Sequence, residues 1–310
     1  MRVVFLGTPE FAVPSLDALV ASGHSVLGAF TQPDRPKGRG QQLAESPVKQ
    51  AALRLGIPVF QPERIRRPES VEQLRSFQAD LMVVVGYGQI IPQSIIDLPP
   101  SGILNVHASL LPKYRGAAPI QWAIANGETT TGVTIMQIDA GLDTGDMLAK
   151  ATAEIGPEET APELSVRLAA LGAQLLVRTV EDIKSGAAQR KKQNDSEATL
   201  APILKKEDGR VDWRAPAREI NDRRRAFTPW PGSYTSFRSQ PLSLIRTEPS
   251  DVKSLPPGAL SVEGRKLLVG TGDGALILSE VQPGGKKRMS SEAFINGYKP
   301  QPGERMGDGQ

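Results

Sequence analysis

The first half of the chain alternates short apolar runs with segments of helical periodicity, and this alternation limits the possible folds more than any other feature. The runs RVVFL at 2–6 and LMVVVG at 81–86 are apolar at nearly every position. A strand of this kind buries both of its faces, which is typical of a parallel sheet covered by helices on each side. The pattern therefore predicts an α/β domain built on a mostly parallel sheet.

Segment 46–56 illustrates the helical half of the pattern. Ser46 suits the N-cap, Pro47 suits the first helical position, and Gly56 is typical of the residue after a helix. Further helices are predicted at 11–23, 70–78, 118–127 and 158–185, and further strands at 25–31, 57–60 and 102–107. These positions give successive strand–helix–strand units.

The alternation changes beyond the helix at 118–127. Runs 132–138 and 146–155 flank a short loop and are expected to pair antiparallel, whereas 190–208 is polar and aperiodic. Later apolar runs are separated by turn signals such as TGDG and PPG, which favours a small antiparallel barrel or sandwich. We therefore predict a domain at 1–189, a linker at 190–208 and a smaller all-β domain at 209–310.

Charge and composition restrict the function classes. Residues 1–189 carry 16 Lys and Arg against 19 Asp and Glu, whereas residues 190–310 carry 21 against 15. A basic C-terminal third is compatible with a polyanionic partner. The chain has no cysteine and two histidines, which excludes a disulfide scaffold and makes a zinc site a poor expectation.

The N-terminus predicts a bacterial cytoplasmic protein. MRVVFLGTPEF has one positive charge, and its apolar run is too short for a signal peptide or a membrane span. No apolar stripe suggests a partner helix, so we expect a monomer.

The turn after the first strand argues against a dehydrogenase. A dinucleotide-binding turn needs the pattern G-x-G-x-x-G, whose second glycine lets the backbone approach the pyrophosphate. Here Gly7 is followed by Thr8, and Pro9 stands in place of that second glycine. An α/β sheet with a different ligand is therefore favoured.

The two histidines have different sequence contexts. His24 lies in the turn SGHSV, where a solvent-facing side chain is expected. His107 ends the predicted strand 102–107, and Asn105 lies two residues earlier, so both side chains project to one face. Open α/β sheets bind ligands at the carboxyl edge of such strands. We therefore expect Asn105 and His107 to be functional.

An amide donor beside an imidazole suits reaction at a carbonyl carbon. The amide donates a hydrogen bond to a developing oxyanion, and an imidazole can hold or release a proton near neutral pH. No G-x-S-x-G motif provides a nucleophile, so the attacking group is expected to arrive with a substrate. A carboxylate to orient the histidine could come from Asp139, Asp143 or Asp146 in the loop IDAGLDTGD.

These motifs carry a family resemblance. NVHASLLPKYRGAAP (105–119) and TGVTIMQIDAGLDTGD (131–146) resemble the signature of the folate-dependent formyltransferases. The loop 31–49 and the stretch RAFTPWPGSY at 225–234 resemble, within that family, the enzymes that act on initiator methionyl-tRNA. The similarity extends through most of residues 1–300.

The resemblance implies a Rossmann-like domain followed by an oligonucleotide-binding-like (OB-like) barrel. It also implies metal-free transfer of a formyl group from 10-formyltetrahydrofolate to the α-amino group of initiator methionyl-tRNA. By motif position, the family's catalytic residues fall on Asn105, His107 and Asp143. Asn105 and His107 are expected to stabilise the oxyanion that forms when the amine attacks.

Binding residues are also implied by the resemblance. Those expected around the folate donor are Val84, Val85, Gly86, Tyr87, Gly88, Gln89, Ile90, Ser109, Leu110, Leu111, Pro112, Asp139, Ala140, Gly141, Leu142 and Thr144. Those expected to contact tRNA are Arg35, Lys37, Arg39, Arg223, Arg224, Arg225, Lys286, Lys287 and Arg288. The loop 31–49, rich in Pro and Gly, is expected to lack regular structure.

Three other functions fit parts of the sequence. A formyltransferase acting on a small amine, such as a nucleotide-linked amino sugar, needs the same catalytic residues but neither a basic loop nor a basic domain. Hydrolysis of formylfolate replaces the amine by water. A non-catalytic RNA-binding protein has no use for an intact set of Asn105, His107 and Asp143.

Overall fold

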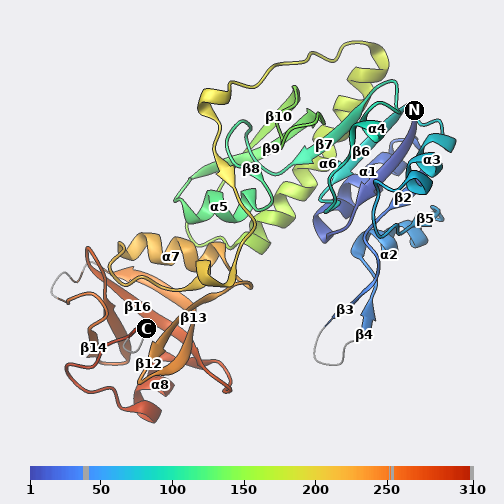
Figure 1. Cartoon of the computed structure of the whole chain (residues 1–310). Helices are drawn as coiled ribbons and strands as arrows, with labels where there is room; N and C mark the ends of the chain where they lie inside the picture. Colours follow the sequence, from blue (N-terminus) through green and yellow to red (C-terminus); the bar gives the residue numbers. More distant parts are fainter. Residues whose placement is uncertain (38–41, 251, 253–254, 308–310) are drawn as a thin grey trace. The chain divides into compact units, whose positions relative to one another are not determined.

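The structure is a computed structural model that describes residues 1–37, 42–250, 252 and 255–307 (Figure 1). Its chain divides into two compact units. The N-terminal unit contains Met1–Pro119, Thr130–Glu154 and Ser165–Pro202, and the C-terminal unit contains Ile120–Thr129, Ile155–Leu164 and Ile203–Gln310. Each unit therefore includes more than one segment of the sequence.

The N-terminal unit is built on a seven-stranded sheet in the order β10-β9-β7-β6-β1-β2-β5. Its strands are β1 (Arg2–Gly7), β2 (Ser25–Phe30), β5 (Val59–Phe60), β6 (Leu81–Val85), β7 (Ile103–His107), β9 (Thr130–Gln137) and β10 (Met147–Glu154). Strands β5, β2, β1, β6 and β7 pair in parallel with their neighbours in the sheet. Strand β9 pairs antiparallel with both β7 and β10. The predicted mostly parallel sheet and the predicted antiparallel pair are both confirmed.

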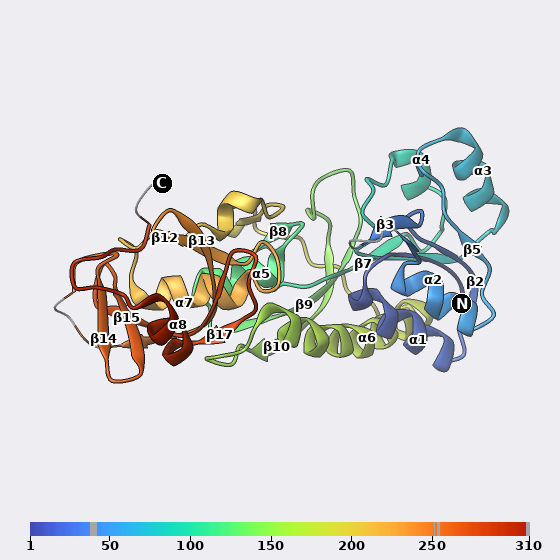
Figure 2. The same ribbon diagram turned by 90° about the horizontal axis from the view of Figure 1, so that it is seen from below.

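Helices cover both faces of this sheet. They are α1 (Val13–Ala21), α2 (Pro47–Arg54), α3 (Pro68–Ser76), α4 (Gln93–Ile96) and α6 (Ala161–Ser185). Figure 2 shows α1 and α6 along one face and α3 and α4 along the other. The Ser46 hydroxyl caps α2 by accepting a hydrogen bond from the Lys49 amide at 3.0 Å, as the sequence predicts. Two-sided cover explains why every residue of β6 is buried.

Two local predictions were wrong. Residues in the loop 31–49 form an antiparallel pair, β3 (Arg35–Lys37) and β4 (Gln42–Ala44), which projects from the body of the N-terminal unit (Figure 1). His24 is 6% exposed rather than solvent-facing, and its Nε2 lies 3.4 Å from Glu181 Oε1 on α6. Neither feature follows from local periodicity, since one needs cross-strand pairing and the other a contact with a distant helix.

The segment predicted as a linker contains ordered contacts. Strand β11 (Leu200–Ala201) pairs in parallel with β8 (Arg115–Gly116), and the backbones of Met147 and Lys191 exchange two hydrogen bonds at 2.8 and 2.9 Å. Short 3-10 helices occupy Asp195–Glu197 and Lys206–Gly209. Residues 190–201 therefore pack onto the N-terminal unit.

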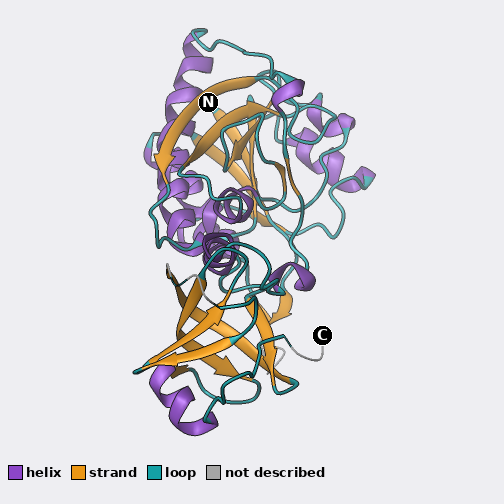
Figure 3. Cartoon of the chain, turned by 90° about the vertical axis from the view of Figure 1, so that its left-hand side faces the viewer, coloured by secondary structure: helices purple, strands orange, loops and turns teal. Residues whose placement is uncertain are grey.

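The C-terminal unit contains an antiparallel sheet in the order β12-β13-β16-β15-β14, with β17 added to β16. Its strands are β12 (Ser233–Phe237), β13 (Gln240–Ser250), β14 (Leu260–Glu263), β15 (Lys266–Gly270), β16 (Ala275–Pro283) and β17 (Met289–Ser290). Figure 3 distinguishes these strands from the helices. The predicted antiparallel β domain is confirmed.

Helices α7 (Ala217–Ala226) and α8 (Ser291–Tyr298) complete this unit, together with most of α5 (Pro119–Ala125). Of these, the sequence predicted only α5. The core joins the sheet to α7 and α8 through side chains such as Ile220, Leu278 and Phe294. Across the described residues, no helix is both long enough and apolar enough to span a membrane.

Candidate active site

Asn105 and His107 project from the face of the sheet opposite α6. Val106, between them, faces α6, because a Cβ added to Gly172 of that helix would lie only 2.9 Å from Val106 Cγ1. Successive side chains of a strand alternate between faces. Both candidate side chains therefore lie on the other face, as their spacing predicts.

Asp143 brings the three predicted catalytic side chains together. Asn105 Nδ2 donates to Asp143 Oδ1 at 3.3 Å, and His107 Nδ1 lies 3.7 Å from Asp143 Oδ2. The backbone amide of Gly116 also donates to Asp143 Oδ2, at 2.8 Å. The side chains of His107 and Asp143 are 5% and 15% exposed, so both are largely shielded from solvent.

The backbone selects which nitrogen of His107 can exchange a proton. His107 Nε2 lies 2.9 Å from the carbonyl oxygen of Tyr114. A carbonyl only accepts hydrogen bonds, so Nε2 must carry a hydrogen and donate it. Nδ1, which faces Asp143, is therefore the nitrogen free to take up and release a proton.

The three candidate aspartates of the loop between β9 and β10 make different contacts. Asp139 accepts from the Gly141 amide at 3.0 Å and from Thr144 Oγ1 at 2.7 Å, so it stabilises the turn. Asp146 offers its backbone carbonyl to the Gln137 amide. Asp143 has a positive φ of 51°, which is uncommon for a residue other than glycine and directs its carboxylate toward Asn105.

The predicted donor-binding stretch 84–90 follows β6. The strand order reverses between β1 and β6, and open α/β sheets bind ligands at such a switch point. Val84 pairs with Asn105 across β6 and β7, which brings the end of β6 next to the candidate catalytic side chains. The position suits a ligand that reaches His107.

Backbone groups dominate this stretch. Gly86 and Gly88 have positive φ angles of 55° and 84°, and a Cβ on Gly86 would lie 2.9 Å from Pro9 Cγ. The Gln89 side chain is turned away to accept from the Ile65 amide at 2.7 Å. The ring of Tyr87 lies in the core, and this burial raises its pKa. The Ile90 side chain, in contrast, is 90% exposed. Any donor held here would contact mainly backbone and Ile90.

The predicted donor residues Ser109 to Pro112 lie mostly inside the protein. Ser109 is fully buried, and its hydroxyl donates to the Lys113 carbonyl at 2.6 Å. Leu111 is also fully buried, and its amide donates to Thr134 Oγ1. These two side chains therefore support the loop rather than line an open surface.

A cavity of about 540 Å³ adjoins the β9–β10 loop. Its lining includes Asp139 and Thr144 from that loop and Arg190, Lys192 and Gln193 from the segment after α6. The volume is within the ~300–1,000 Å³ range of small-molecule sites. Among the residues predicted for the donor, Asp139 and Thr144 are the ones it shares.

The predicted tRNA contacts fall into separate groups. Arg35 is exposed on β3, Lys37 ends that strand, and Arg39 lies outside the described residues. Lys286, Lys287 and Arg288 are all exposed between β16 and β17. These exposed cations remain candidates for phosphate contacts, which need accessible side chains.

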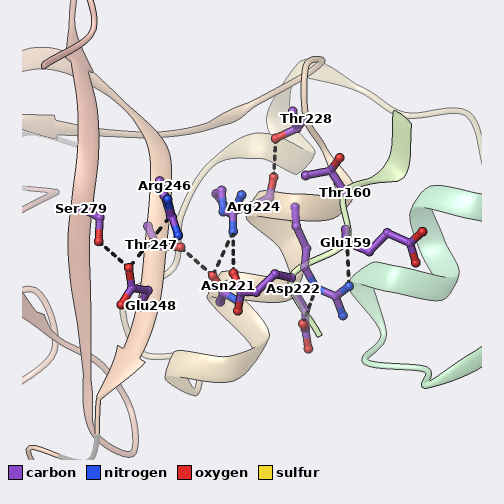
Figure 4. A network of polar contacts seen from close by, with 12 residues as sticks. Glu159, Thr160, Asn221, Asp222, Arg224, Thr228, Arg246, Thr247, Glu248 and Ser279 are labelled. Atoms are coloured by element: carbon purple, nitrogen blue, oxygen red, sulfur yellow. Dashed lines mark hydrogen bonds and ion pairs between the residues drawn. The ribbon is translucent and has the colours of Figure 1, made fainter. Parts of the chain in front are cut away.

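Arg224 and Arg225 do not have the exposure that a phosphate contact requires. They are 5% and 4% exposed and belong to a polar network in the C-terminal unit, of which Figure 4 labels Arg224 and Asp222. Arg225 Nε donates to Asp222 Oδ1 at 2.9 Å, and its Nη1 donates to the carbonyl oxygens of Gly156 and Glu159. Burial lowers the pKa of Arg224. Both arginines are structural in this network, so their prediction as phosphate contacts is corrected.

Arg223, the third arginine of this run, is half-buried. Its Nη2 donates to the Asp208 carbonyl at 3.0 Å, and its guanidinium lies 5.0 Å from the ring centroid of Phe227. The sequence did not single out Arg115 or Gln193. Arg115 Nε donates to Gln193 Oε1, and Gln193 Nε2 donates to the carbonyl oxygen of Asp143. In the described part of the chain, no three His, Asp or Glu side chains are arranged to hold a metal ion.

Comparison with protein families matches nearly the whole chain. The family described as formyl transferase matches residues 1–180. The family described as formyl transferase, C-terminal domain, matches residues 203–299. The two matches correspond to the α/β region and the antiparallel β region.

Two relatives are similar along their entire length. A methionyl-tRNA formyltransferase of Solibacter usitatus is 60% identical over 310 residues, which cover 100% of this chain and 99% of the relative. A methionyl-tRNA formyltransferase of Koribacter versatilis is 57% identical over 309 residues, which cover 99% of each chain.

Solved structures share the fold at lower identity. An N-formyltransferase from Helicobacter canadensis, in complex with folinic acid and dTDP-3-aminofucose, has a TM-score of 0.68 at 18% identity and covers 91% of this chain and 99% of its own. HypX from Aquifex aeolicus, in complex with tetrahydrofolic acid, has a TM-score of 0.64 at 18% identity and covers 95% of this chain and 47% of its own. These similarities concern the fold alone.

Proposed function

The chain belongs to the formyl transferase family, and on that premise we propose that it transfers the formyl group of 10-formyltetrahydrofolate to the α-amino group of initiator methionyl-tRNA. The observation that carries this proposal is the 60% identity, over the whole chain, with a relative named methionyl-tRNA formyltransferase. The geometry around His107 supports the chemistry.

The reaction begins with attack of the amine on the formyl carbon. An α-amino group has an ordinary pKa of about 7.7–8.0, so part of the substrate is neutral and nucleophilic near pH 7. A carbon–nitrogen bond forms, and negative charge collects on the formyl oxygen. Asn105 Nδ2, which donates to Asp143 over a long 3.3 Å, can turn its hydrogen toward this oxygen.

Proton transfer then completes the exchange. His107 Nδ1 gives its proton to the departing nitrogen of the folate as the bond from that nitrogen to the formyl carbon breaks. Asp143 accepts the proton that the amine loses. The 3.7 Å separation between His107 Nδ1 and Asp143 Oδ2 is short enough for this proton to return to the imidazole after a small movement. The products are the formylated amine and tetrahydrofolate.

Binding of both substrates is part of the same proposal. The 84–90 stretch and the Asp139–Thr144 loop hold the folate donor, and Arg35, Lys286, Lys287 and Arg288 contact tRNA phosphates together with Lys37 and Arg39. The enzyme acts as a cytoplasmic monomer. Size-exclusion chromatography with and without tRNA tests the monomer.

Formyl transfer by wild type and His107→Ala tests the proposed function. General acid–base catalysis contributes about 10²–10⁴-fold, so we expect kcat to fall by that amount in the variant. His24→Ala, which removes the other histidine, is the matched control and should keep near-normal kcat in its folded fraction. Full activity of His107→Ala would refute the mechanism.

The acceptor is tested separately. A wild-type enzyme that formylates a nucleotide-linked amino sugar but not methionyl-tRNA would replace the tRNA proposal by the small-amine alternative. Release of formate alone would indicate a hydrolase. Folate binding without reaction on either amine would favour the non-catalytic RNA-binding alternative.

A further inference from the structure

Gln193, in the segment predicted as a linker, contacts the loop that carries Asp143. We propose that Gln193, oriented by Arg115, is a positioning residue that holds Asp143 in reach of His107 and Asn105 during formyl transfer. This inference rests on the proposed function, because formyl transfer is its readout.

The Gln193 amide is fully used by the protein. Its Nε2 donates to the carbonyl oxygens of Asp143 and Gly145, both at 2.8 Å. Its Oε1 accepts from Arg115 Nε at 3.0 Å and from Arg115 Nη2 at 2.8 Å. Carbonyls only accept and guanidinium groups only donate, so the amide has one possible orientation. Gln193 thus clamps the backbone on both sides of Thr144.

Arg115 connects this clamp to the other side of Asp143. The arginine is 7% exposed, and its Nη2 also donates to Asp195 Oδ1 at 2.7 Å. The next residue, Gly116, donates its amide to Asp143 Oδ2. One segment therefore holds the carboxylate directly through Gly116 and the loop backbone indirectly through Gln193.

Asp143 needs such support because of its backbone and its contacts. A φ of 51° is unfavourable for a residue with a side chain and persists where surrounding contacts enforce it. The distances of 3.3 Å to Asn105 and 3.7 Å to His107 leave little room for displacement. An error of about 1 Å in the position of a catalytic group can cost ~100-fold in rate.

The surrounding segment is fixed in the same way. Lys191 exchanges backbone hydrogen bonds with Met147 at the start of β10, and Thr199 Oγ1 accepts from the Tyr114 amide at 2.8 Å. The Tyr114 carbonyl in turn accepts from His107 Nε2. Residues 190–201 therefore support the peptide groups that orient both His107 and Asp143.

The first experiment measures steady-state formyl transfer in Gln193→Ala and Gln193→Glu. Gln193→Ala removes the clamp, and Gln193→Glu keeps the contact with Arg115 but turns a carboxylate oxygen toward the two carbonyls. We expect kcat to fall about 10- to 100-fold in both, with the KM for methionyl-tRNA nearly unchanged. The control Asn194→Ala removes a neighbouring exposed amide that binds Ser196 and Glu197, and should keep wild-type kcat.

A double-mutant cycle then separates positioning from general destabilisation. If Gln193 acts through Asp143, Gln193→Ala lowers kcat in the wild-type background but adds no further loss to Asp143→Ala. An equal loss in both backgrounds, or unchanged kcat in both Gln193 variants, would overturn the inference. If Gln193→Ala does not fold, Gln193→Glu replaces it in the double-mutant cycle. A wild type that transfers no formyl group would instead overturn the proposed function, and the inference with it.

Discussion

Two polar clusters, one in each unit, contrast in how the protein uses their hydrogen-bonding capacity. On α7, Arg225 is paired with Asp222 at 2.9 Å and also donates to two backbone carbonyls. Beside β7, the contacts of Asp143 with Asn105 and His107 are longer, at 3.3 and 3.7 Å. The α7 cluster, in which Arg225 is held by a carboxylate and two carbonyls, stabilises the fold. The longer contacts of the β7 cluster leave capacity for the substrate that we propose.

The largest expected effect comes from breaking the α7 cluster with Arg225→Ala. Asp222, which is 5% exposed, would lose its charged partner, and removing one member of a buried pair costs about 3–5 kcal/mol. Urea denaturation should show this loss in the free energy of unfolding, whereas kcat of the folded enzyme stays near wild type. Arg218→Ala, an exposed arginine on the same helix, is the control. A change below about 1 kcal/mol would mean that the pair contributes little.

The opposite pattern is expected for Asn105→Ala. Loss of one donor to a developing oxyanion costs about 10²–10³ in kcat, or ~2.7–4 kcal/mol of transition-state stabilisation. The free energy of unfolding should change much less, because the hydrogen bond that the Asn105 side chain makes to Asp143 is long, at 3.3 Å. Parallel measurement of kcat and urea denaturation checks both expectations. Equal losses in activity and stability would remove the contrast between the clusters.

A smaller effect is expected for the exposed cations Lys286, Lys287 and Arg288. Replacing all three with Ala should weaken tRNA binding and lower the salt slope of the affinity by about one unit for each phosphate that is no longer neutralised. Titrations at several salt concentrations measure this slope, with Lys266→Ala, an exposed lysine on β15, as control. An unchanged slope would remove these three from the tRNA surface. A lower slope in Arg225→Ala would return that arginine to it.

The smallest expected effect concerns His24. Burial is the main cause that lowers its pKa, and the N-terminal amine and Lys184 lower it further, whereas Glu181 raises it. Because the folded state favours the neutral imidazole, its contribution to stability is complete above the ordinary pKa of 6.5 and is lost as the pH falls below that value. Urea denaturation across this pH range should show a steeper acid-side decline for wild type than for His24→Gln. Parallel curves would contradict the shift.

Periodicity was sufficient to predict the sheet, but it did not predict every contact between segments around it. Apolar runs such as 81–86 mark strands buried on both faces, and all of β6 is buried. The pairing of β3 with β4 and the packing of His24 against α6 depend on contacts between segments. Such contacts leave no periodic signal in either segment alone.

The candidate site divides in the same way. The two-residue spacing placed Asn105 and His107 on one face, but spacing alone left three aspartates as partners. Only the folded loop, with its positive φ at Asp143, distinguishes them. Arg225 looked like an exposed cation in a basic run because its acceptors, the carbonyls of Gly156 and Glu159, lie 69 and 66 positions away. Gln193 lacked a signal for the same reason.

The C-terminal unit is assembled from chain segments that are far apart in the sequence, and their order has a consequence for synthesis on the ribosome. Helix α5 contributes the buried side chains Ile120, Ala123 and Ile124, and Trp122 meets Phe227 of the same unit at a ring-centroid distance of 5.7 Å. Phe227 is added about 100 residues later, which takes ~5–20 s at synthesis rates of ~5–20 residues per second. Until then Trp122 emerges from the ribosome without the ring of Phe227. A stalled or truncated chain that ends within 190–208 would therefore lack this aromatic contact of α5 permanently.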